Sequence, residues 1–208
     1  MSANPKKPLT PQEYLARERL AEFRSEYYRG EVFAMAGASM QHTLIKDNLA
    51  AEARGQLKET PCRVMTSDMR VKVDVTGLYT YPDIAIVRDE PQLEDDVFDT
   101  LLNPRALVEV LSDSTEKYDR GTKFAHYRQI PSLQEYVLIA QDRLLMERYV
   151  RQADQSWVQT VFTDSTRGFE TLRSRSGCRS RRSIAALSCP RTRDGDLLPP
   201  LALACISL

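Results

Sequence analysis

Two acidic side chains stand in stretches of the sequence that are otherwise mostly apolar. Asp83 lies in "YPDIAIV" (81–87), and Glu109 lies in "LVEVL" (107–111). An ionised carboxylate inside an apolar core is costly unless it has a partner. Mg²⁺ takes hard oxygen ligands, commonly one or two carboxylates together with water and a substrate phosphate. If the two carboxylates converge, these residue types therefore predict a divalent-cation site that supports phosphodiester hydrolysis.

Strand geometry places these two acids but leaves other interpretations open. Residues two apart share a face of a strand, so Leu107, Glu109 and Leu111 point one way. Asp83 directly follows Pro82, which suits the start of a strand or an edge strand. Asp83 could instead cap a turn, and Glu109 could lie on an edge strand with one exposed side. Either alternative would make the acid structural.

Composition restricts the class of protein. The chain has 208 residues, of which 42% are hydrophobic and 28% charged, which is typical of one globular domain with a sizeable core. No apolar run approaches the ~20 residues of a membrane span. The N-terminal residues lack the apolar stretch of a signal peptide. We therefore expect a cytoplasmic protein that makes no membrane contact.

The cysteines and histidines exclude two kinds of metal site. The four cysteines show no CxxC pair and no histidine at zinc spacing, so we expect free thiols in a reducing compartment. With His42 and His126 as the only histidines, a multi-histidine metal site is excluded.

The secondary-structure pattern predicts a mixed order of helices and strands. One helix is opened by Thr10-Pro11-Gln12-Glu13, whose Thr and Glu form a capping box, and apolar stripes predict two more helices. These two helices cover 42–58 and 116–128. Strands are predicted at 25–28, 31–35, 63–65, 71–75, 83–87, 106–111, 135–140, 144–150 and 157–162, and an acidic surface loop at 88–105. The order predicts an α+β fold with one central mixed sheet flanked by helices.

Five segments carry a resemblance to a known family, and they occur in that family's order. They are "YRGEVFAMAGASMQH" (28–42), "SDMRVKV" (67–73), "YPDIAIV" (81–87), "LVEVLSDSTEKYDRGTKFAHYRQI" (107–130) and "EYVLI" (135–139). Through these segments the chain resembles the Uma2 family of proposed endonucleases, and the resemblance covers roughly residues 10–172. This family was formerly a domain of unknown function and belongs to the PD-(D/E)XK nuclease superfamily. The resemblance implies the restriction-endonuclease-like fold.

The resemblance also implies a site. Asp83 would be the acid of the "PD" element and Glu109 the acid of the second element, and both would hold Mg²⁺ or Mn²⁺. The lysine of the (D/E)XK element should stand at position 111, where this chain has Leu111. In the family the lysine looks to have migrated to the following helix, where Lys123 would assist catalysis.

Lys123 also has a structural interpretation. Asp119 and Lys123 are four apart on a predicted helix, so a surface ion pair worth only ~0.3–0.5 kcal/mol competes with the catalytic role. Tyr127 follows one turn later and is favoured as a core residue over a catalytic one.

Three further residues are candidates for the site. The resemblance puts Glu31 and His42 near the acids, although a surface position or a place in the first helical turn explains them equally well. Asp68, in "SDMR", is either a third acid or a turn residue.

The implied function is metal-dependent hydrolysis of phosphodiester bonds, with DNA as the substrate. The alternative is a catalytically inactive nuclease-fold module that binds nucleic acid or a protein. A homodimer is compatible with the resemblance, because many nucleases of this fold pair.

The last 36 residues differ from the rest of the chain. Residues 173–208 hold seven of the 29 basic and two of the 29 acidic residues, which leaves 22 basic and 27 acidic residues, a net charge of −5, in 1–172. We predict a nuclease-like domain over 1–172 and an Arg/Ser-rich tail over 173–208 that packs poorly. The tail is either a basic DNA-binding segment or, as the preferred hypothesis, the product of a frameshift.

Overall fold

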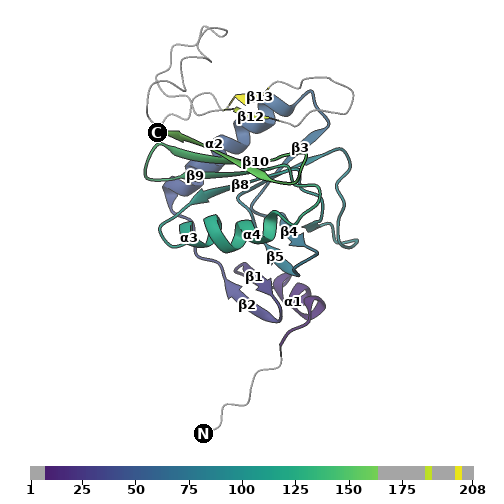
Figure 1. The fold of residues 1–208 in the computed structure, drawn as a ribbon. Coiled ribbons are helices and arrows are strands. Elements are labelled where there is room, and N and C mark those ends of the chain that lie inside the picture. The colour runs from purple at the N-terminus through teal and green to yellow at the C-terminus, as the bar shows by residue number, and fades with distance from the viewer. Residues whose placement is uncertain (1–7, 164–185, 189–199, 203–208) are drawn as a thin grey trace, which may run out of the picture.

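Two mixed β-sheets form the framework of this computed structural model (Figure 1), which describes residues 8–163 and the backbone of 186–188 and 200–202. The five-stranded sheet has the order β2 (Glu31–Ala34), β1 (Ser25–Tyr28), β5 (Leu78–Thr80), β4 (Arg70–Val73) and β7 (Thr100–Leu101). The six-stranded sheet has the order β11 (Trp157–Thr163), β10 (Leu145–Arg151), β9 (Glu135–Ala140), β8 (Ala106–Leu111), β6 (Ile84–Arg88) and β3 (Cys62–Thr66). Two short strands, β12 (Ala186–Ser188) and β13 (Pro200–Ala202), pair with each other.

The predicted α+β class with a central mixed sheet flanked by helices is confirmed, and the structure adds a second mixed sheet of five strands. A turn after β3, in which the Met69 N–H donates to the Thr66 carbonyl (2.9 Å), takes the chain out of the six-stranded sheet. The following strand β4 then pairs with β5, and β5 pairs with β1. Alternation along a strand predicts which face is buried but does not predict the partner strand, so the division into two sheets could not be read from the pattern.

The first helix forms as its capping residues predict. In α1 (Pro11–Glu18) the Thr10 hydroxyl accepts from the Glu13 N–H (3.2 Å), and the Glu13 carboxylate accepts from the Thr10 N–H (2.8 Å). This capping box satisfies two N–H groups that an uncapped helix leaves without partners. Tyr14 and Leu15 then pack against Tyr27 of β1 and Tyr79 of β5.

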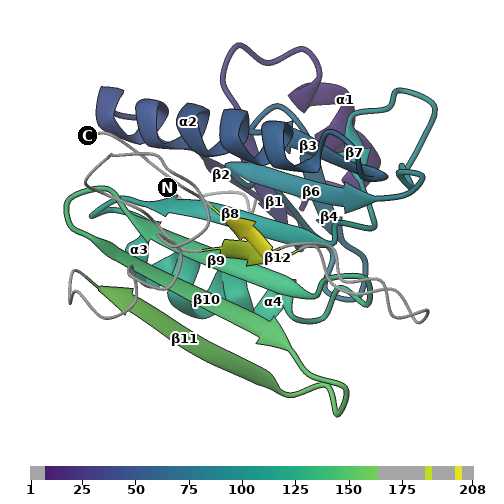
Figure 2. The ribbon, with the colours of Figure 1, turned by 90° about the horizontal axis from the view of Figure 1, so that it is seen from above.

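The second helix covers one face of the six-stranded sheet. In α2 (Met40–Leu57), the buried stripe packs on the sheet and consists of Ile45, Leu49, Ala50, Ala53 and Leu57. Figure 2 shows α2 running along this face, on the side opposite to α3 and α4. The helix begins two residues before its predicted start because the Ser39 hydroxyl accepts from the His42 N–H (3.0 Å) and caps it.

The helical segment on the opposite face is interrupted. The sequence predicts one helix over 116–128, whereas the structure has α3 (Glu116–Tyr118), the π-helical turn η1 (Asp119–Lys123) and α4 (Phe124–Tyr127). Gly121, a poor helix former, lies at the centre of η1. Asp119 and Lys123 at its two ends are both buried. Such π-helical turns are rare and occur frequently at functional sites.

Strand β8 lies in the interior of its sheet, and its side chains alternate between the two faces of the sheet as predicted. Val108 and Val110 belong to the core cluster under α2, and Leu107 and Leu111 belong to the cluster that contains Tyr127 of α4. Glu109 therefore faces the α4 side. Because β8 pairs with β6 on one edge and with β9 on the other, the edge-strand interpretation of Glu109 is wrong.

Several predictions fall wholly or partly outside the described residues. The boundary at residue 172 and the tail over 173–208 lie there, apart from the backbone of β12 and β13. Of the four cysteines, Cys62 lies in the described part, half-buried at the start of β3. Within the described chain, the helices are too short or too polar to cross a membrane.

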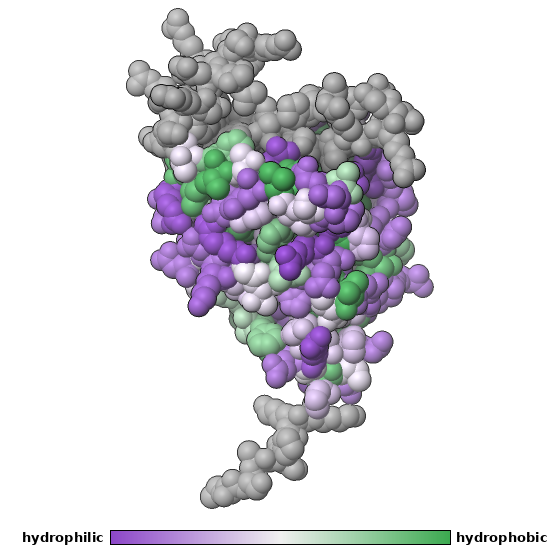
Figure 3. Space-filling view, in the orientation of Figure 1, coloured by the Kyte–Doolittle hydropathy of each residue, from purple (hydrophilic) through white to green (hydrophobic). Residues whose placement is uncertain are grey.

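Both sheets have an outer strand with exposed apolar side chains. Val32 and Phe33 of β2 are 44% and 48% exposed, and Val158 and Val161 of β11 are each 51% exposed. On the face drawn in Figure 3, apolar residues form separate small areas among hydrophilic ones.

The β1–β2 hairpin yields a stability prediction. Gly30 has a φ of +92°, and a Cβ built there would lie 2.5 Å from Pro8 Cβ. Gly30→Ala should therefore lower the free energy of unfolding by at least about 1–2 kcal/mol, the cost of a left-handed conformation in a residue with a Cβ. Urea denaturation measures this change.

The matched control is the exposed Gly55 near the end of α2, where an added Cβ would have no atom within 4 Å. Gly55→Ala should raise the free energy of unfolding by about 0.5–1 kcal/mol, because alanine loses less entropy in a helix. Equal effects of the two substitutions would contradict this account of the hairpin.

Candidate active site

Asp83 and Glu109 lie side by side at the end of the β6–β8 ladder. Strand pairing aligns Ile84 with Val108, so the residue before β6 and the residue after Val108 are neighbours. The Val110 N–H donates to Asp83 Oδ2 (2.8 Å), and the Asp83 N–H lies 3.4 Å from Glu109 Oε2, which accepts its hydrogen bond. Asp83 therefore binds a backbone group of the neighbouring strand, which is not the local turn cap of the structural interpretation.

His42 approaches Asp83 from the first turn of α2. Its Nε2 lies 2.8 Å from Asp83 Oδ1, and the two side chains are 16% and 13% exposed. Because the Val110 N–H donates to the other carboxylate oxygen, both oxygens of Asp83 have a partner and the side chain is held in one orientation. The structure thus brings His42 into the cluster, as the resemblance implies.

Glu109 lies deeper than Asp83 and is 4% exposed. Its Oε1 accepts hydrogen bonds from Lys123 Nζ (2.9 Å) and from the Tyr127 hydroxyl (2.9 Å). Tyr127 is fully buried, so it is a core residue whose polar end contacts the site. Two fixed donors on one oxygen leave Oε2 of Glu109 turned toward Asp83.

Lys123 is a buried residue, and the interpretation of a surface ion pair with Asp119 is wrong. The side chain of Lys123 is 6% exposed, and its Nζ lies 2.9 Å from Glu109, 3.4 Å from Asp119 and 3.5 Å from Glu26. These three acids come from β8, η1 and β1. The predicted i,i+4 pair with Asp119 exists, but it is one part of a buried cluster of four charges.

Sequence reasoning did not identify Glu26. Its carboxylate accepts hydrogen bonds from the Tyr118 hydroxyl (2.9 Å) and from the Thr80 hydroxyl, and the residue is 9% exposed. The available signal was the alternation in "SEYY" (25–28), which places Glu26 and Tyr28 on one face. That signal gives the face of the strand but not its distance from Lys123.

Burial and charge together set the protonation of this cluster. Burial raises the pKa of Glu109, the charge of Lys123 opposes this increase, the charges of Asp119 and Asp83 add to it, and the resulting pKa is about 8. Burial likewise raises the pKa of Asp119. Burial alone would lower the pKa of Lys123, but the surrounding carboxylates raise it well above its ordinary value. One ammonium among several carboxylates leaves an excess of negative charge that a proton on Glu109 relieves.

The donor set fits a divalent cation. Asp83 and Glu109 present adjacent carboxylates, and oxygen ligands of this kind suit Mg²⁺ or Mn²⁺. A cation beside Glu109 would oppose the burial and the carboxylate charges that raise its pKa. Within residues 8–163, no three His, Cys, Asp or Glu side chains converge to form a metal site alone. The residues therefore fit a cation that takes its remaining ligands from water and substrate.

Two of the sequence-based candidates lie away from this cluster. Glu31 is exposed at the end of β2, where it pairs with Tyr28 across the hairpin. Asp68 is 81% exposed and forms an ion pair with Arg24. Among the described contacts, neither carboxylate touches Asp83 or Glu109. The structure thus does not bring Glu31 and Asp68 into the site.

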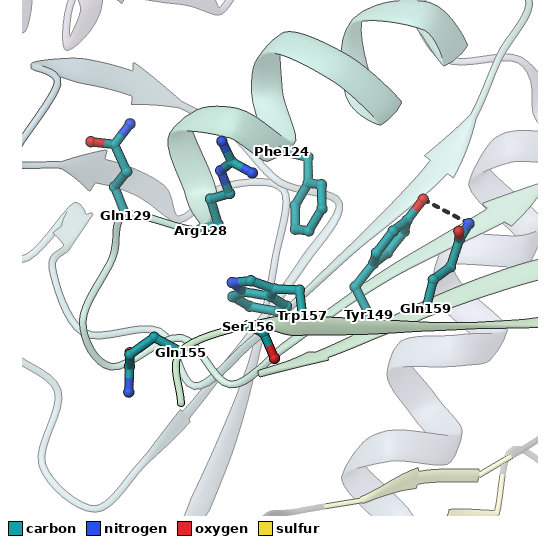
Figure 4. Close-up of a pocket in the computed structure, with 8 residues that line it drawn as sticks. All are labelled: Phe124, Arg128, Gln129, Tyr149, Gln155, Ser156, Trp157 and Gln159. Carbon is teal, nitrogen blue, oxygen red and sulfur yellow. Dashed lines mark hydrogen bonds between the residues drawn. The ribbon is translucent and has the colours of Figure 1, made fainter. Parts of the chain in front are cut away.

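Apart from this cluster, a concavity lies between α4 and the β10–β11 hairpin and has a volume of about 550 Å³. Phe124, Tyr149 and Trp157 point toward one another there, and Gln159 donates to the Tyr149 hydroxyl (2.9 Å) (Figure 4). The residues that line this groove are aromatic, amide-bearing, hydroxyl-bearing or basic. Since no carboxylate lines it, this groove offers no metal ligand, and the acidic cluster remains the candidate active site.

Comparisons with known proteins agree with the fold and with a nuclease family. The family model named Uma2, "Putative restriction endonuclease", matches residues 11–179. Two similar relatives come from Synechocystis sp. (strain ATCC 27184 / PCC 6803 / Kazusa). "Uncharacterized protein sll1609" is 37% identical over 74% of this chain and 87% of its own length. "Uncharacterized protein slr1290" is 34% identical over 76% of this chain and 83% of its own length.

A solved structure has the same fold. It is that of a putative nuclease belonging to DUF820 from Anabaena variabilis ATCC 29413, with a TM-score of 0.61 and 20% sequence identity. The similarity covers 76% of this chain and 86% of that chain. The predicted restriction-endonuclease-like fold is therefore confirmed.

The protonation of Glu109 yields a prediction on stability and pH. Because the pKa of Glu109 rises from 4.5 in the unfolded chain to about 8 in the native one, folding binds a proton in this range. Its contribution to stability is complete below pH 4.5 and is lost as the pH rises through 8. Glu109→Gln, which stays neutral, should therefore gain in melting temperature relative to the parent between pH 5 and 8 in EDTA. Parallel pH profiles of the two proteins would show that Glu109 is ionised at all these pH values.

Proposed function

This chain belongs to the Uma2 family, and on that premise we propose that it is a divalent-cation-dependent endonuclease that hydrolyses phosphodiester bonds of DNA. The observation that carries the proposal is the pair of adjacent carboxylates, Asp83 and Glu109, joined through the Val110 and Asp83 N–H groups. The two acids lie at the end of a strand ladder, and Lys123 contacts Glu109. This arrangement supports the site that the family resemblance implies. The nuclease-like fold supports the same proposal.

The two acids have the proposed role of metal ligands. A Mg²⁺ or Mn²⁺ ion bound there would supply Lewis-acid polarisation of a phosphate oxygen and a water of lowered pKa. Asp83 keeps one orientation because His42 and Val110 bind its two oxygens. Glu109 keeps Oε2 toward Asp83 because Lys123 and Tyr127 bind its other oxygen.

Lys123 and Tyr127 act in this proposal as positioning residues. The ammonium of Lys123 favours the ionised form of Glu109, which is the form that binds a cation. Asp119 and Glu26 hold that ammonium in place. The catalytic assistance expected of Lys123 is thus exerted through Glu109.

The alternative function is a nuclease-fold module that binds nucleic acid or a protein without cleaving. Leu111 favours this alternative, because it fills the position of the superfamily's lysine and is buried in the core cluster of the α4 side. A cleavage assay separates the two functions.

Cleavage of supercoiled plasmid DNA tests the proposed activity. The parent should nick or linearise the plasmid in millimolar Mg²⁺ or Mn²⁺ and not in EDTA. Asp83→Asn and Glu109→Gln should each reduce the rate at least about 100-fold, in line with removal of a group that stabilises charge in the transition state.

Glu31→Gln is the matched control, since it neutralises an exposed carboxylate outside the cluster and should leave the rate unchanged. A parent that binds DNA but does not cleave it with either ion would support the alternative function.

Thermal melting tests the metal site without reference to activity. A cation that binds the native state stabilises it by mass action, by about 2.7 kcal/mol at 100 times the dissociation constant. Millimolar Mn²⁺ should therefore raise the melting temperature of the parent, and more so at pH 8 than at pH 6, because it competes with the proton on Glu109.

Asp83→Asn should abolish most of this rise, and Glu31→Gln should retain it. An equal rise in the parent and in Asp83→Asn would place the cation elsewhere.

A further inference from the structure

Lys46 of α2 has a half-buried ammonium with weak partners. Its side chain is 17% exposed, and among the described residues its Nζ contacts Ser67 Oγ at 3.3 Å and the Asp47 carboxylate at 3.8 Å. The carboxylate of Asp47 is itself 63% exposed. By contrast, Lys72, which is 21% exposed, has carboxylates at 2.7 and 2.9 Å. A cation withdrawn from water is stabilised by a nearby anion, and Lys46 has none at close range.

Lys46 is connected to Asp83 through two shared neighbours, His42 and Ser67. It follows His42 by one helical turn, so the two side chains are neighbours on α2. Its partner Ser67 follows β3, whose last pair with β6 joins Thr66 to Ile84. Ser67 and Asp83 therefore adjoin across the end of this ladder.

Arg24 approaches Ser67 from the loop before β1. Its Nη1 donates to the Ser67 carbonyl (2.7 Å), and its guanidinium carbon lies 5.4 Å from the centre of the Tyr81 ring. Tyr81 precedes Asp83 by two residues. Arg24 is 44% exposed, and its carboxylate partner Asp68 is 81% exposed. An exposed pair of this kind contributes only about 0–1 kcal/mol, so another anion can replace Asp68.

The cations around the acids thus differ in their surroundings. Lys123 lies on the buried side of Glu109, where three carboxylates surround it. Lys46 and Arg24 lie at Ser67, on the side of Asp83, and neither is enclosed by acids. Ser67 adds a hydroxyl to the same place.

We propose that Lys46, Arg24 and Ser67 form a subsite that binds a phosphate group of the nucleic-acid backbone next to Asp83. Two cations and a hydroxyl supply the donors that a phosphate diester accepts, and they stand beside the carboxylate that the proposed reaction uses. The proposal deepens the proposed function and rests on it. It assigns the contact with substrate to Lys46 and Arg24 and the orientation of Glu109 to Lys123.

Binding of a short fluorescent DNA duplex in EDTA tests the subsite without cleavage. The logarithm of the binding constant falls linearly with the logarithm of salt concentration, and each lost phosphate contact should make this slope less steep by about 0.9. Lys46→Gln should therefore weaken binding about 3- to 10-fold at low salt and reduce the slope by about one contact. Lys46→Arg should restore both, and Lys46→Gln/Arg24→Gln should lose about two contacts.

Lys58→Gln is the matched control, because Lys58 is exposed at the far end of the same helix, and it should leave the affinity and slope unchanged. In the cleavage assay, Lys46→Gln should raise KM more than it lowers kcat, and its melting temperature should stay near that of the parent.

The outcomes separate the subsite from the proposed function. If the parent binds and cleaves DNA and Lys46→Gln has the parent's affinity and slope, the subsite is overturned and the nuclease function stands. If Lys46→Gln and Lys58→Gln weaken binding equally, the attraction is general and the subsite is likewise overturned. A parent that neither binds nor cleaves DNA would overturn both proposals.

Discussion

The buried ammonium of Lys123 is the constraint on which the rest of the site depends. It lies within 3.5 Å of carboxylates from Glu26, Glu109 and Asp119, which belong to β1, β8 and η1. A buried charge is tolerated only where its partners are well placed, so these elements must meet in one arrangement. The five-stranded sheet, the six-stranded sheet and the helical segment are thereby joined at one atom. The orientation of Glu109, and with it the pairing with Asp83, follows from this contact.

Local patterns predicted those parts of the site that depend on periodicity. The alternation of side chains around Glu109 predicted the face of the sheet on which it lies, and Pro82 predicted that a strand begins near Asp83. The capping residues Thr10 and Glu13 predicted the first residue of α1. The contacts of Glu26 with Lys123 and of Lys46 with Ser67 depend on how distant segments pack, which no local period encodes. The π-helical turn and the second sheet escaped prediction for the same reason, and the family resemblance supplied what periodicity could not, the meeting of Asp83 with Glu109.

Charge is distributed unevenly across the site. On the buried side, acids outnumber the single lysine, and the pKa of Glu109 is raised. On the side of Ser67, Lys46 and Arg24 meet, and their acidic partners Asp47 and Asp68 are both largely exposed. Asp83 lies between the two sides and is bound by His42. In the proposed function, the inner side would hold the cation and the outer side the phosphate group that the cation polarises for attack by water.

The parallel pairing of β8 with β9 has a consequence for how the molecule folds. Parallel neighbours cannot be joined by a tight turn and need a crossover connection, which here is the segment of α3, η1 and α4. Lys123 and Tyr127 lie on that crossover, and Glu109, which both of them contact, lies on the first of the two strands that the crossover joins. The connection that joins β8 to β9 at the centre of the sheet therefore also places Lys123 next to Glu109. Formation of the charged cluster is thus coupled to the pairing of β8 with β9.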